Sequence, residues 1–409
     1  MKHVVFLTPF MGLNMYRFIR PIADFPGVKL SLVTQQPSEF IPSQLKEKLA
    51  GHYKVGNALD PGQLAIAVRH LANSVGPVYR FFGAMEELQI PLAKVRDYLK
   101  IEGMDTRTAI NFREKHVMKD VLRSNGLPCA KHCLASSLED AQAFAKQIGY
   151  PLVIKPPAGV GTRNTFEIHD DESLKHYVLG FAPSKESPIL LEEFIQGEEY
   201  SFETFSIQGK PVWTSYTRYY PRPLEVMKNP WIQWCVLMPA QRVNPENQDI
   251  EKANYKALEV LGMKTGLSHM EWFRRKDGSI AISEVAARPP GAMIMPLLWH
   301  AHDFDFYEAW GKLMVFDYFD APERKYSSGC AFLRGMGKGR VKAVHGLDKI
   351  KETLGDLVVE TTIPQKGQPQ SPSYEGDGKI VVRHPDVEIV KKALSLIISN
   401  VRVEYDVRL

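Results

Sequence analysis

Cysteine, long apolar runs and an excess of either charge are all scarce in this sequence of 409 residues. The four cysteines, Cys129, Cys133, Cys235 and Cys330, are too few and too scattered for a disulfide framework or a zinc knuckle. Cys129 and Cys133 are four residues apart, which fits a metal pair, but two ordinary reduced thiols are the simpler interpretation.

The charge balance and hydropathy exclude further classes of protein. There are 51 Lys and Arg against 47 Asp and Glu, a net charge of +4, which gives no electrostatic reason for binding nucleic acid or a membrane surface. No apolar run reaches the roughly 18 residues of a membrane-spanning helix. The apolar opening stretch is soon broken by Pro9 and is typical of a buried strand, not of a signal peptide. We therefore expect a cytoplasmic protein of several domains, with no nucleic-acid or membrane partner.

The first hundred residues alternate short apolar runs with helical patterns. This alternation predicts an open parallel α/β sheet with helices on both faces. Such a sheet usually binds a ligand at the carboxyl ends of its strands. A break near residue 103 sets the first domain at 1–105. The expected strands are 4–7, 30–34 and 78–82, and the expected helices are 63–75 and 86–100.

The rest of the chain has an α+β pattern. We expect domains at 106–190, 191–322 and 323–409, the last one small. The expected helices are 113–124, 138–148, 247–261 and 387–400, and the expected strands are 151–156, 165–168, 188–195, 197–207 and 210–220. Proline-rich 221–230 and polar 361–379 are expected to be loops. Strands 267–275 and 279–287 flank a Lys-Asp-Gly turn, which predicts a hairpin.

Two glutamates on this hairpin carry the strongest chemical signal. Antiparallel pairing would bring Glu271 close to Glu284, both among apolar residues. Two such carboxylates repel each other and need a proton, a basic partner or a hard cation. Mg²⁺ shared with a polyphosphate fits this arrangement, whereas the alternative is a pair of exposed strand glutamates. Arg288, four residues after Glu284, could hold a carboxylate or phosphate, or simply pair with Glu284.

Two weaker motifs precede the hairpin. Lys155 ends an apolar strand before the loop PPAGVGTRN, whose backbone N–H groups could wrap a triphosphate, or which could be an ordinary surface turn. The loop is neither a Walker A motif nor a dinucleotide fingerprint. The segment LLEEFIQGEEYSFE could offer acceptors to an adenine and a ribose, or be a charged hairpin.

Taken in order, these pieces resemble the ATP-grasp superfamily. Lys115 on a helix, Lys155 before a glycine loop, EEFIxGEE, and Glu271 and Glu284 with ExxxR follow one another as in that family, over roughly residues 1–330. The resemblance implies an ATP-grasp fold, with ATP and Mg²⁺ (or Mn²⁺) as cofactors. It further implies an adenine site at Glu192, Phe194 and Ile195, a ribose contact from Glu199, and Glu271 and Glu284 as metal ligands. The catalytic residues would be Arg288, Lys155 and Lys115, the two lysines also contacting the phosphates, and a phosphate flap at 159–165 would include Gly159, Gly161 and Thr162.

One position departs from the family pattern. Many members carry ExNxR, but Ala286 replaces the asparagine here, so a second metal ion would lose a ligand. Within the superfamily, the N-terminal sheet, the phrase EELQIPLAKVRDYLKIEGM and the turn AARPPGA resemble bacterial L-amino-acid (dipeptide) ligases. That resemblance implies an ADP-forming carboxylate–amine ligase that acts through an acyl phosphate on small substrates, amino acids by preference, as a possible homodimer. The alternatives are an ATP-dependent carboxylase, a ligase with another partner, and a non-catalytic ATP-binding regulator; the acid and the amine stay open.

Other motifs have ordinary interpretations. The pair His300 and His302 is expected at the start of an apolar helix, as surface or capping histidines. His269, two residues before Glu271, faces the same side as that carboxylate, as a residue supporting it or as a packed histidine. Arg218 and Arg222, among tyrosines, are expected to line the ATP and substrate cleft, and 335–340 is expected to be a loop. No GxSxG or HExxH motif supports hydrolase chemistry.

Overall fold

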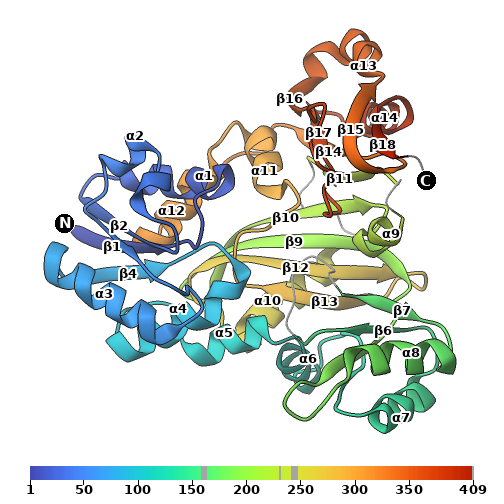
Figure 1. The fold of residues 1–409 in the computed structure, drawn as a ribbon, viewed down its shortest axis with the longest axis horizontal. Coiled ribbons are helices and arrows are strands. Elements are labelled where there is room, and N and C mark those ends of the chain that lie inside the picture. Colours follow the sequence, from blue (N-terminus) through green and yellow to red (C-terminus); the bar gives the residue numbers. More distant parts are fainter. Residues whose placement is uncertain (158–163, 230–231, 241–246, 408–409) are drawn as a thin grey trace.

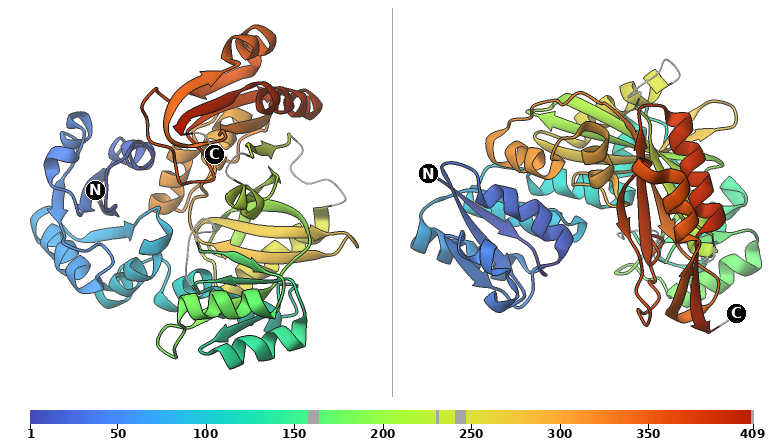
Figure 2. Two further views of the ribbon diagram at one scale, coloured as in Figure 1. Left: turned by 45° about the vertical axis from the view of Figure 1, so that its right-hand side comes forward. Right: turned by 90° about the horizontal axis from the view of Figure 1, so that it is seen from above.

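The computed structural model describes residues 1–157, 164–229, 232–240 and 247–407. Within these residues the strands form four sheets, arranged as Figure 1 shows. The chain runs from an N-terminal sheet (blue) through a small sheet (green) into a long central sheet, and it ends in a strand-rich part (orange and red). Figure 2 shows from two further directions that the N-terminal elements and the small sheet lie apart, on different sides of the central sheet. This is the multi-domain mixture of α/β and α+β structure that the sequence predicts.

The N-terminal sheet is parallel, with the strand order β3-β2-β1-β4. Its central strand β1 is buried along most of its length because helices cover the sheet, which explains its unbroken apolar run. The three predicted strands are confirmed, whereas the segment predicted as one helix over 86–100 begins as a 3-10 turn that carries Glu86. The elements are β1 (Lys2–Leu7), α1 (Leu13–Ala23), β2 (Val28–Thr34), η1 (Ser38–Phe40), α2 (Ser43–Lys46), β3 (Gly51–Lys54), α3 (Pro61–Val75), β4 (Val78–Phe82), η2 (Glu86–Leu88) and α4 (Gln89–Leu99).

The small sheet is antiparallel and has the order β5-β8-β6-β7. One face packs on α7 and α8 around a core that includes Phe144, Ile154 and Leu174. Each helix begins at a side-chain cap, Ser137 for α7 and Asp170 for α8, which fixes where the chain turns back to the sheet. The elements are α5 (Thr106–Arg113), α6 (Lys115–Ser124), β5 (His132–Ala135), α7 (Leu138–Ile148), β6 (Leu152–Lys155), β7 (Phe166–Ile168), α8 (Asp171–Phe181) and β8 (Ile189–Glu193).

The central sheet has eight strands in the order β13-β12-β9-β10-β11-β14-β17-β16, and neighbouring strands are antiparallel. Side chains alternate between its faces. On β9 and β12, Phe202 and Trp272 pack toward the helices α6 and α10, and Phe205 packs toward α11 and α12. The elements are β9 (Gly197–Ile207), β10 (Lys210–Tyr220), α9 (Pro223–Lys228), β11 (Trp234–Met238), α10 (Gln248–Leu261), β12 (Gly266–Arg275), β13 (Ile280–Ala286), α11 (Ile294–His302) and α12 (Phe306–Phe316).

The C-terminal strands extend the central sheet, and β15 pairs with β18 beside it. Their core packs on the closing helix α14, which confirms the helix predicted over 387–400. The predicted loop 361–379 is confirmed between β16 and β17 apart from its first and last residues. The elements are β14 (Ser327–Leu333), β15 (Lys338–His345), α13 (Leu347–Leu354), η4 (Gly355–Leu357), β16 (Val358–Thr362), β17 (Gly378–His384), α14 (Val387–Asn400) and β18 (Arg402–Val407).

Three local predictions are wrong. The proline-rich stretch 221–230 contains the helix α9, because Pro223 occupies a first-turn position where its missing N–H costs nothing. His300 and His302 end the helix α11 instead of starting one. Residues 338–340, expected in a loop, begin the strand β15.

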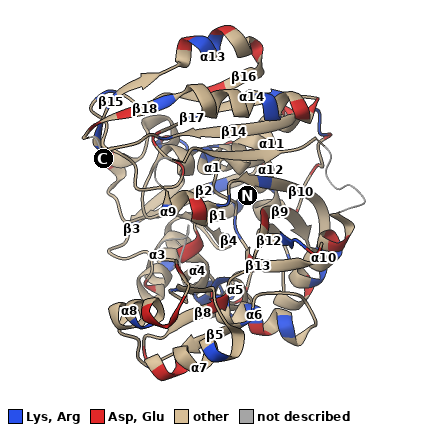
Figure 3. Ribbon diagram, turned by 90° about the vertical axis from the view of Figure 1, so that its right-hand side faces the viewer, with Lys and Arg blue, Asp and Glu red and all other residues tan. Residues whose placement is uncertain are grey.

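Charged residues of both signs are distributed over the molecule. Figure 3 shows Lys and Arg interspersed with Asp and Glu along helices such as α10 and α13. Among the described residues, no helix is both long and apolar enough to cross a membrane. The mixed surface agrees with the small net charge of the sequence.

Candidate functional site

One cavity, with a volume of about 410 Å³, is lined by residues from α1 and the segment after β4, from the small and central sheets and from the C-terminal part of the chain. Its size falls within the range of small-molecule sites. All nine described site residues predicted from the sequence line it: Lys115, Lys155, Glu192, Phe194, Ile195, Glu199, Glu271, Glu284 and Arg288. The predicted flap residues Gly159, Gly161 and Thr162 lie outside the described residues.

Glu271 and Glu284 face each other across the hairpin. They are direct partners in the β12–β13 register, and a bulge follows immediately after this pair. Lys115, at the start of α6, forms an ion pair with Glu284, whose side chain is 22% exposed. Burial alone would raise the pKa of Glu284, but Lys115 and Lys155 outweigh it and lower this pKa to about 2. Glu284 is therefore a carboxylate that stays ionised in a half-buried site.

Lys155 and Glu192 lie on neighbouring strands of the small sheet, and both line the cavity. β6 ends at Lys155, whose Nζ lies 2.8 Å from Glu192 Oε2 on β8. Burial lowers the pKa of Lys155, but Glu192 and Glu284 overcome this effect and raise it. Lys155 thus stays charged although it is buried, which is what a group that neutralises phosphates requires.

Lys119 is a buried cation that sequence reasoning missed. Its Nζ donates a hydrogen bond to the Ser283 carbonyl at 2.6 Å and lies 3.4 Å from Glu192 Oε1. Burial lowers the pKa of Lys119, and Glu192 opposes that shift. Its position in the sequence could have indicated this role, because Lys119 follows Lys115 by one helical turn and lies on the same face of α6.

Glu199 behaves differently from the other carboxylates. It is 9% exposed and pairs in register with Phe273 of β12. Burial, together with the nearby Glu271 charge, raises the pKa of Glu199 to about 8. At neutral pH it is therefore mainly protonated, so that it can both donate and accept a hydrogen bond.

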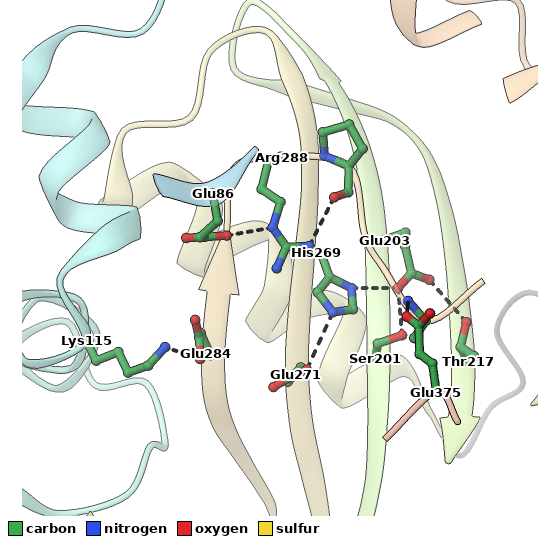
Figure 4. Close-up of polar contacts among 12 residues, drawn as sticks. Glu86, Lys115, Ser201, Glu203, Thr217, His269, Glu271, Glu284, Arg288 and Glu375 are labelled. Carbon is green, nitrogen blue, oxygen red and sulfur yellow. Dashed lines mark hydrogen bonds and ion pairs between the residues drawn. The ribbon is translucent and has the colours of Figure 1, made fainter. Parts of the chain in front are cut away.

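Arg288 is held by a residue of the N-terminal part. Its Nε donates to Glu86 Oε2 at 2.6 Å and its Nη1 donates to the Pro289 carbonyl at 3.0 Å, as Figure 4 shows. The simple pair with Glu284 considered above is not the arrangement found. Glu86 was missed because 202 residues separate it from Arg288. The sequence could still have suggested a role for Glu86, because it lies just after β4, at the carboxyl end of a parallel strand, where such sheets bind ligands.

His269 lies between two carboxylates beneath the hairpin. Its Nδ1 is 3.0 Å from Glu203 Oε1 and its Nε2 is 3.6 Å from Glu271 Oε1 (Figure 4). The Ser201 hydroxyl donates to Glu203 at 2.6 Å, and that of Thr217 does so at 3.4 Å. Burial lowers the pKa of His269, but the two glutamates overcome it and raise this pKa to about 9. This geometry agrees with a histidine that supports Glu271, and less well with one that is simply packed in the core.

Comparison with known proteins agrees with this arrangement of charges. Residues 120–292 match the family model of the ATP-grasp domain. This stretch of the chain has the ATP-grasp fold. This match includes Lys155, the hinge around Glu192 and the hairpin carboxylates, and it confirms the fold that the resemblance implied.

Proteins with similar sequences include curated ligases. An L-arginine-specific L-amino acid ligase of Bacillus subtilis is 26% identical over 243 residues, which are 58% of this chain and 57% of the relative. An alanine–anticapsin ligase of Bacillus subtilis (strain 168) is 29% identical over 227 residues, which are 50% of this chain and 47% of the relative. The chain thus spans about half the length of these curated relatives.

Solved structures share the ATP-grasp fold along the whole chain. An L-amino acid ligase from Bacillus licheniformis superposes with a TM-score of 0.76 at 19% identity, and 99% of each chain is covered. The N5-carboxyaminoimidazole ribonucleotide synthetase from Thermotoga maritima superposes with a TM-score of 0.70 at 17% identity, covering 99% of this chain and 100% of the other. At these identities the likeness establishes the fold alone.

The ATP-grasp cavity offers a donor set that suits magnesium. Glu271 and Glu284 present carboxylate oxygens, which a hard divalent cation prefers. In the described part of the chain, no group of three or more His, Cys, Asp and Glu residues is arranged to hold a metal ion. The two carboxylates therefore fit an ion that takes its remaining ligands from phosphate and water.

Of the remaining residues singled out in the sequence, some line the cavity and others lie outside its lining. Arg222 lines the cavity, with its guanidinium 4.8 Å from the Phe194 ring centre. The expectation for Arg218 is wrong, since it pairs with Glu198 at 2.8 Å, away from the lining of the ATP-grasp cavity. His300 lies 3.2 Å from Glu360 Oε2. All four cysteines are free thiols.

Proposed function

We propose that this protein is an ATP-dependent carboxylate–amine ligase that joins amino acids through an acyl phosphate and releases ADP and phosphate. One observation carries the proposal: a single cavity gathers Lys115, Lys155, the paired carboxylates Glu271 and Glu284, and Arg288. The ATP-grasp domain and the similarity to the two Bacillus ligases support the same reaction class.

We assign the ATP site to the end of the cavity that the small sheet forms. The backbone around Phe194 and Ile195 would receive the edge of adenine, beside the buried Glu192. Glu199, protonated at neutral pH, would exchange hydrogen bonds with the ribose hydroxyls. Lys115 and Lys155 would neutralise the phosphates, for which two buried cations beside each other are suited.

Glu271 and Glu284 would hold magnesium in this site. When bound, the ion neutralises charge on the ATP phosphates, and its other ligands come from phosphate and water. His269 fixes the position of Glu271 through its contact with Glu203, so that the carboxylate does not need to reorganise.

The reaction needs positioning and charge neutralisation more than covalent chemistry from the protein. A carboxylate oxygen of the acid attacks the γ-phosphorus; one P–O bond forms and the bond to the β-phosphate oxygen breaks, releasing ADP. The amine nitrogen then attacks the acyl carbon, the C–N bond forms, phosphate leaves with its C–O bond electrons, and the amine gives up a proton. Arg288 would stabilise the negative oxygens of both steps.

The test is release of phosphate from ATP in the presence of Mg²⁺ and amino acids, singly and in pairs. We expect release that depends on both substrates, together with a condensed product seen by mass spectrometry. ATP hydrolysis that no acid or amine stimulates would contradict the proposal. If label from bicarbonate entered a product instead, the reaction would be an ATP-dependent carboxylation and not a ligation of amino acids.

A further inference from the structure

We infer that the acid substrate carries an apolar side chain, aromatic or long aliphatic, that binds in an aromatic corner of the cavity. The aromatic corner is the part of the wall made by Met15, Phe18, Tyr219, Trp234 and Tyr374. This inference rests on the proposed function, since it names the substrate class of the same site.

The two apolar parts of the cavity belong to separate hydrophobic clusters. Ile195 and Phe273 pack with Ala130 and Ala281 on the side of the small sheet, where adenine is placed above. The aromatic corner belongs to a different cluster, which joins the N-terminal sheet to α11 and α12. A nucleotide and a second ligand can therefore each have an apolar wall of their own.

The corner is built from rigid contacts among aromatic rings. The Trp234 ring centre lies 5.5 Å from that of Tyr219 and 4.9 Å from that of Tyr374, the latter at an interplanar angle of 85°. The Trp234 indole N–H donates to the Pro221 carbonyl at 2.9 Å. This polar atom is already used, and the Trp234 ring is only 1% exposed. Trp234 therefore supports the corner from behind, and the partly exposed Met15 and Tyr374 are its more accessible members.

The corner also adjoins the arginine that would bind the reacting carboxyl. Residues 289–292, which follow Arg288 directly, line the cavity, and Ala292 belongs to the same cluster as Trp234. A substrate whose carboxyl group lies at Arg288 thus has an apolar wall within reach of its side chain. Glu87 lines the cavity next to the Glu86–Arg288 pair and provides a carboxylate for the ammonium group that amino acids share.

The chemistry of the corner disfavours a charged side chain. A guanidinium or carboxylate there would lose its water and meet aromatic carbon, which costs binding free energy. Each methylene group buried in such a wall strengthens binding by about fourfold. We expect kcat/KM for phenylalanine, leucine or methionine as the acid to exceed that for alanine by about 10- to 100-fold.

The experiment compares the intact protein with two single variants. Met15→Glu places a carboxylate in the corner from α1, at a partly exposed position. Leu13→Glu is the matched control: it makes a comparable change on the same helix, at a side chain that is 72% exposed and lies outside the cavity lining. Binding of single amino acids is measured by calorimetry with a non-hydrolysable ATP analogue and Mg²⁺, and phosphate release is measured in parallel.

We expect the unaltered protein and Leu13→Glu to bind phenylalanine and leucine at least tenfold more tightly than aspartate and arginine. Met15→Glu should lose this preference and gain affinity for arginine. Because Met15 packs against the hydrophobic cluster, some loss of stability is expected, and binding is compared at a temperature well below the unfolding midpoint of every variant. Equal binding of charged and apolar amino acids, or no amino-acid binding at all, would overturn the inference. Apolar amino acids that bind without any phosphate release would support the aromatic corner and contradict the ligase function instead.

Discussion

Replacing Glu86 by glutamine removes one negative charge from the contact that holds Arg288, at nearly unchanged shape. The Nε–Oε2 distance is 2.6 Å, and the two side chains are only 16% and 5% exposed. Glutamine can still accept the hydrogen bond, so the variant isolates the effect of charge. We expect Glu86→Gln both to destabilise the protein and to weaken binding of the acid substrate.

The magnitude follows from the burial of the pair. Two unit charges about 4 Å apart at an effective dielectric constant of about 20 attract each other by about 4 kcal/mol. Part of this is offset because burying the two charges costs solvation free energy. We therefore expect the free energy of unfolding to fall by about 2–3 kcal/mol, which for a chain of 409 residues lowers the thermal midpoint by about 2–4 °C.

We expect Glu86→Gln to weaken binding of the acid substrate and to leave binding of ATP unchanged. The neutral amide would hold Arg288 toward the cavity less firmly than the carboxylate does, so the KM for the acid is expected to rise by about tenfold or more. Glu86 lies on the Arg288 side of the cavity, and the ATP site is placed at the small sheet, so we expect the affinity for ATP to stay the same. Calorimetric unfolding and steady-state kinetics with each substrate varied in turn measure both effects.

The matched control is an exposed ion pair of similar length. Lys256 Nζ and Glu259 Oε2 are 3.0 Å apart, with side chains 47% and 69% exposed. Glu259→Gln should cost less than about 0.5 kcal/mol because water screens this pair. If Glu86→Gln changed neither the unfolding midpoint nor the KM for the acid, beyond what Glu259→Gln does, the assigned role of Glu86 would be refuted.

Three further predictions concern other parts of the molecule. Glu284→Gln should abolish ATP turnover while circular dichroism shows an intact fold; a variant that keeps most of its turnover would exclude Glu284 as a metal ligand. His269→Asn should raise the magnesium concentration for half-maximal turnover by about 10-fold or more, with ATP binding measured in EDTA unchanged, and an unaltered magnesium titration would count against it. Burial, as the main cause, lowers the pKa of His3 below 6.5, so that the unfolded chain binds a proton which the folded chain does not. Stability should therefore fall as pH drops below about 6.5 toward the folded-state pKa; His3→Gln should flatten this dependence, and an identical pH profile in both proteins would disprove it.

The sequence predicted those cavity residues whose positions are determined by their neighbours along the chain. Three residues identify the turn of the hairpin, and the register of its two strands then places Glu271 opposite Glu284. Lys155 could be recognised because an apolar strand ends at it. In each case a few neighbouring residues determine both the position and the exposure of the group.

The missed residues are those whose role depends on distant partners. Glu86 meets Arg288 only because the N-terminal sheet packs beside the central one, which no local pattern encodes. Glu203 looks like an ordinary strand residue until β12 pairs with β9 and places His269 directly opposite it. Its polar neighbours at every second position, Glu199 and Ser201, were a usable signal that one face of β9 is not core.

The continuity of the central sheet has a consequence for how this protein can be cut or recombined. β11 pairs with β14 along its whole length, and the Trp234 ring stacks on Phe332 with centres 4.9 Å apart. Cutting the chain at residue 322 would leave β11 with an open edge, which invites aggregation. It would also take away the support of Trp234 and remove Tyr374. The C-terminal part of the chain thus supports one wall of the cavity and contributes Tyr374 to its lining. In a chimaera that takes this part from a relative, we expect the substrate preference to shift toward that of the relative.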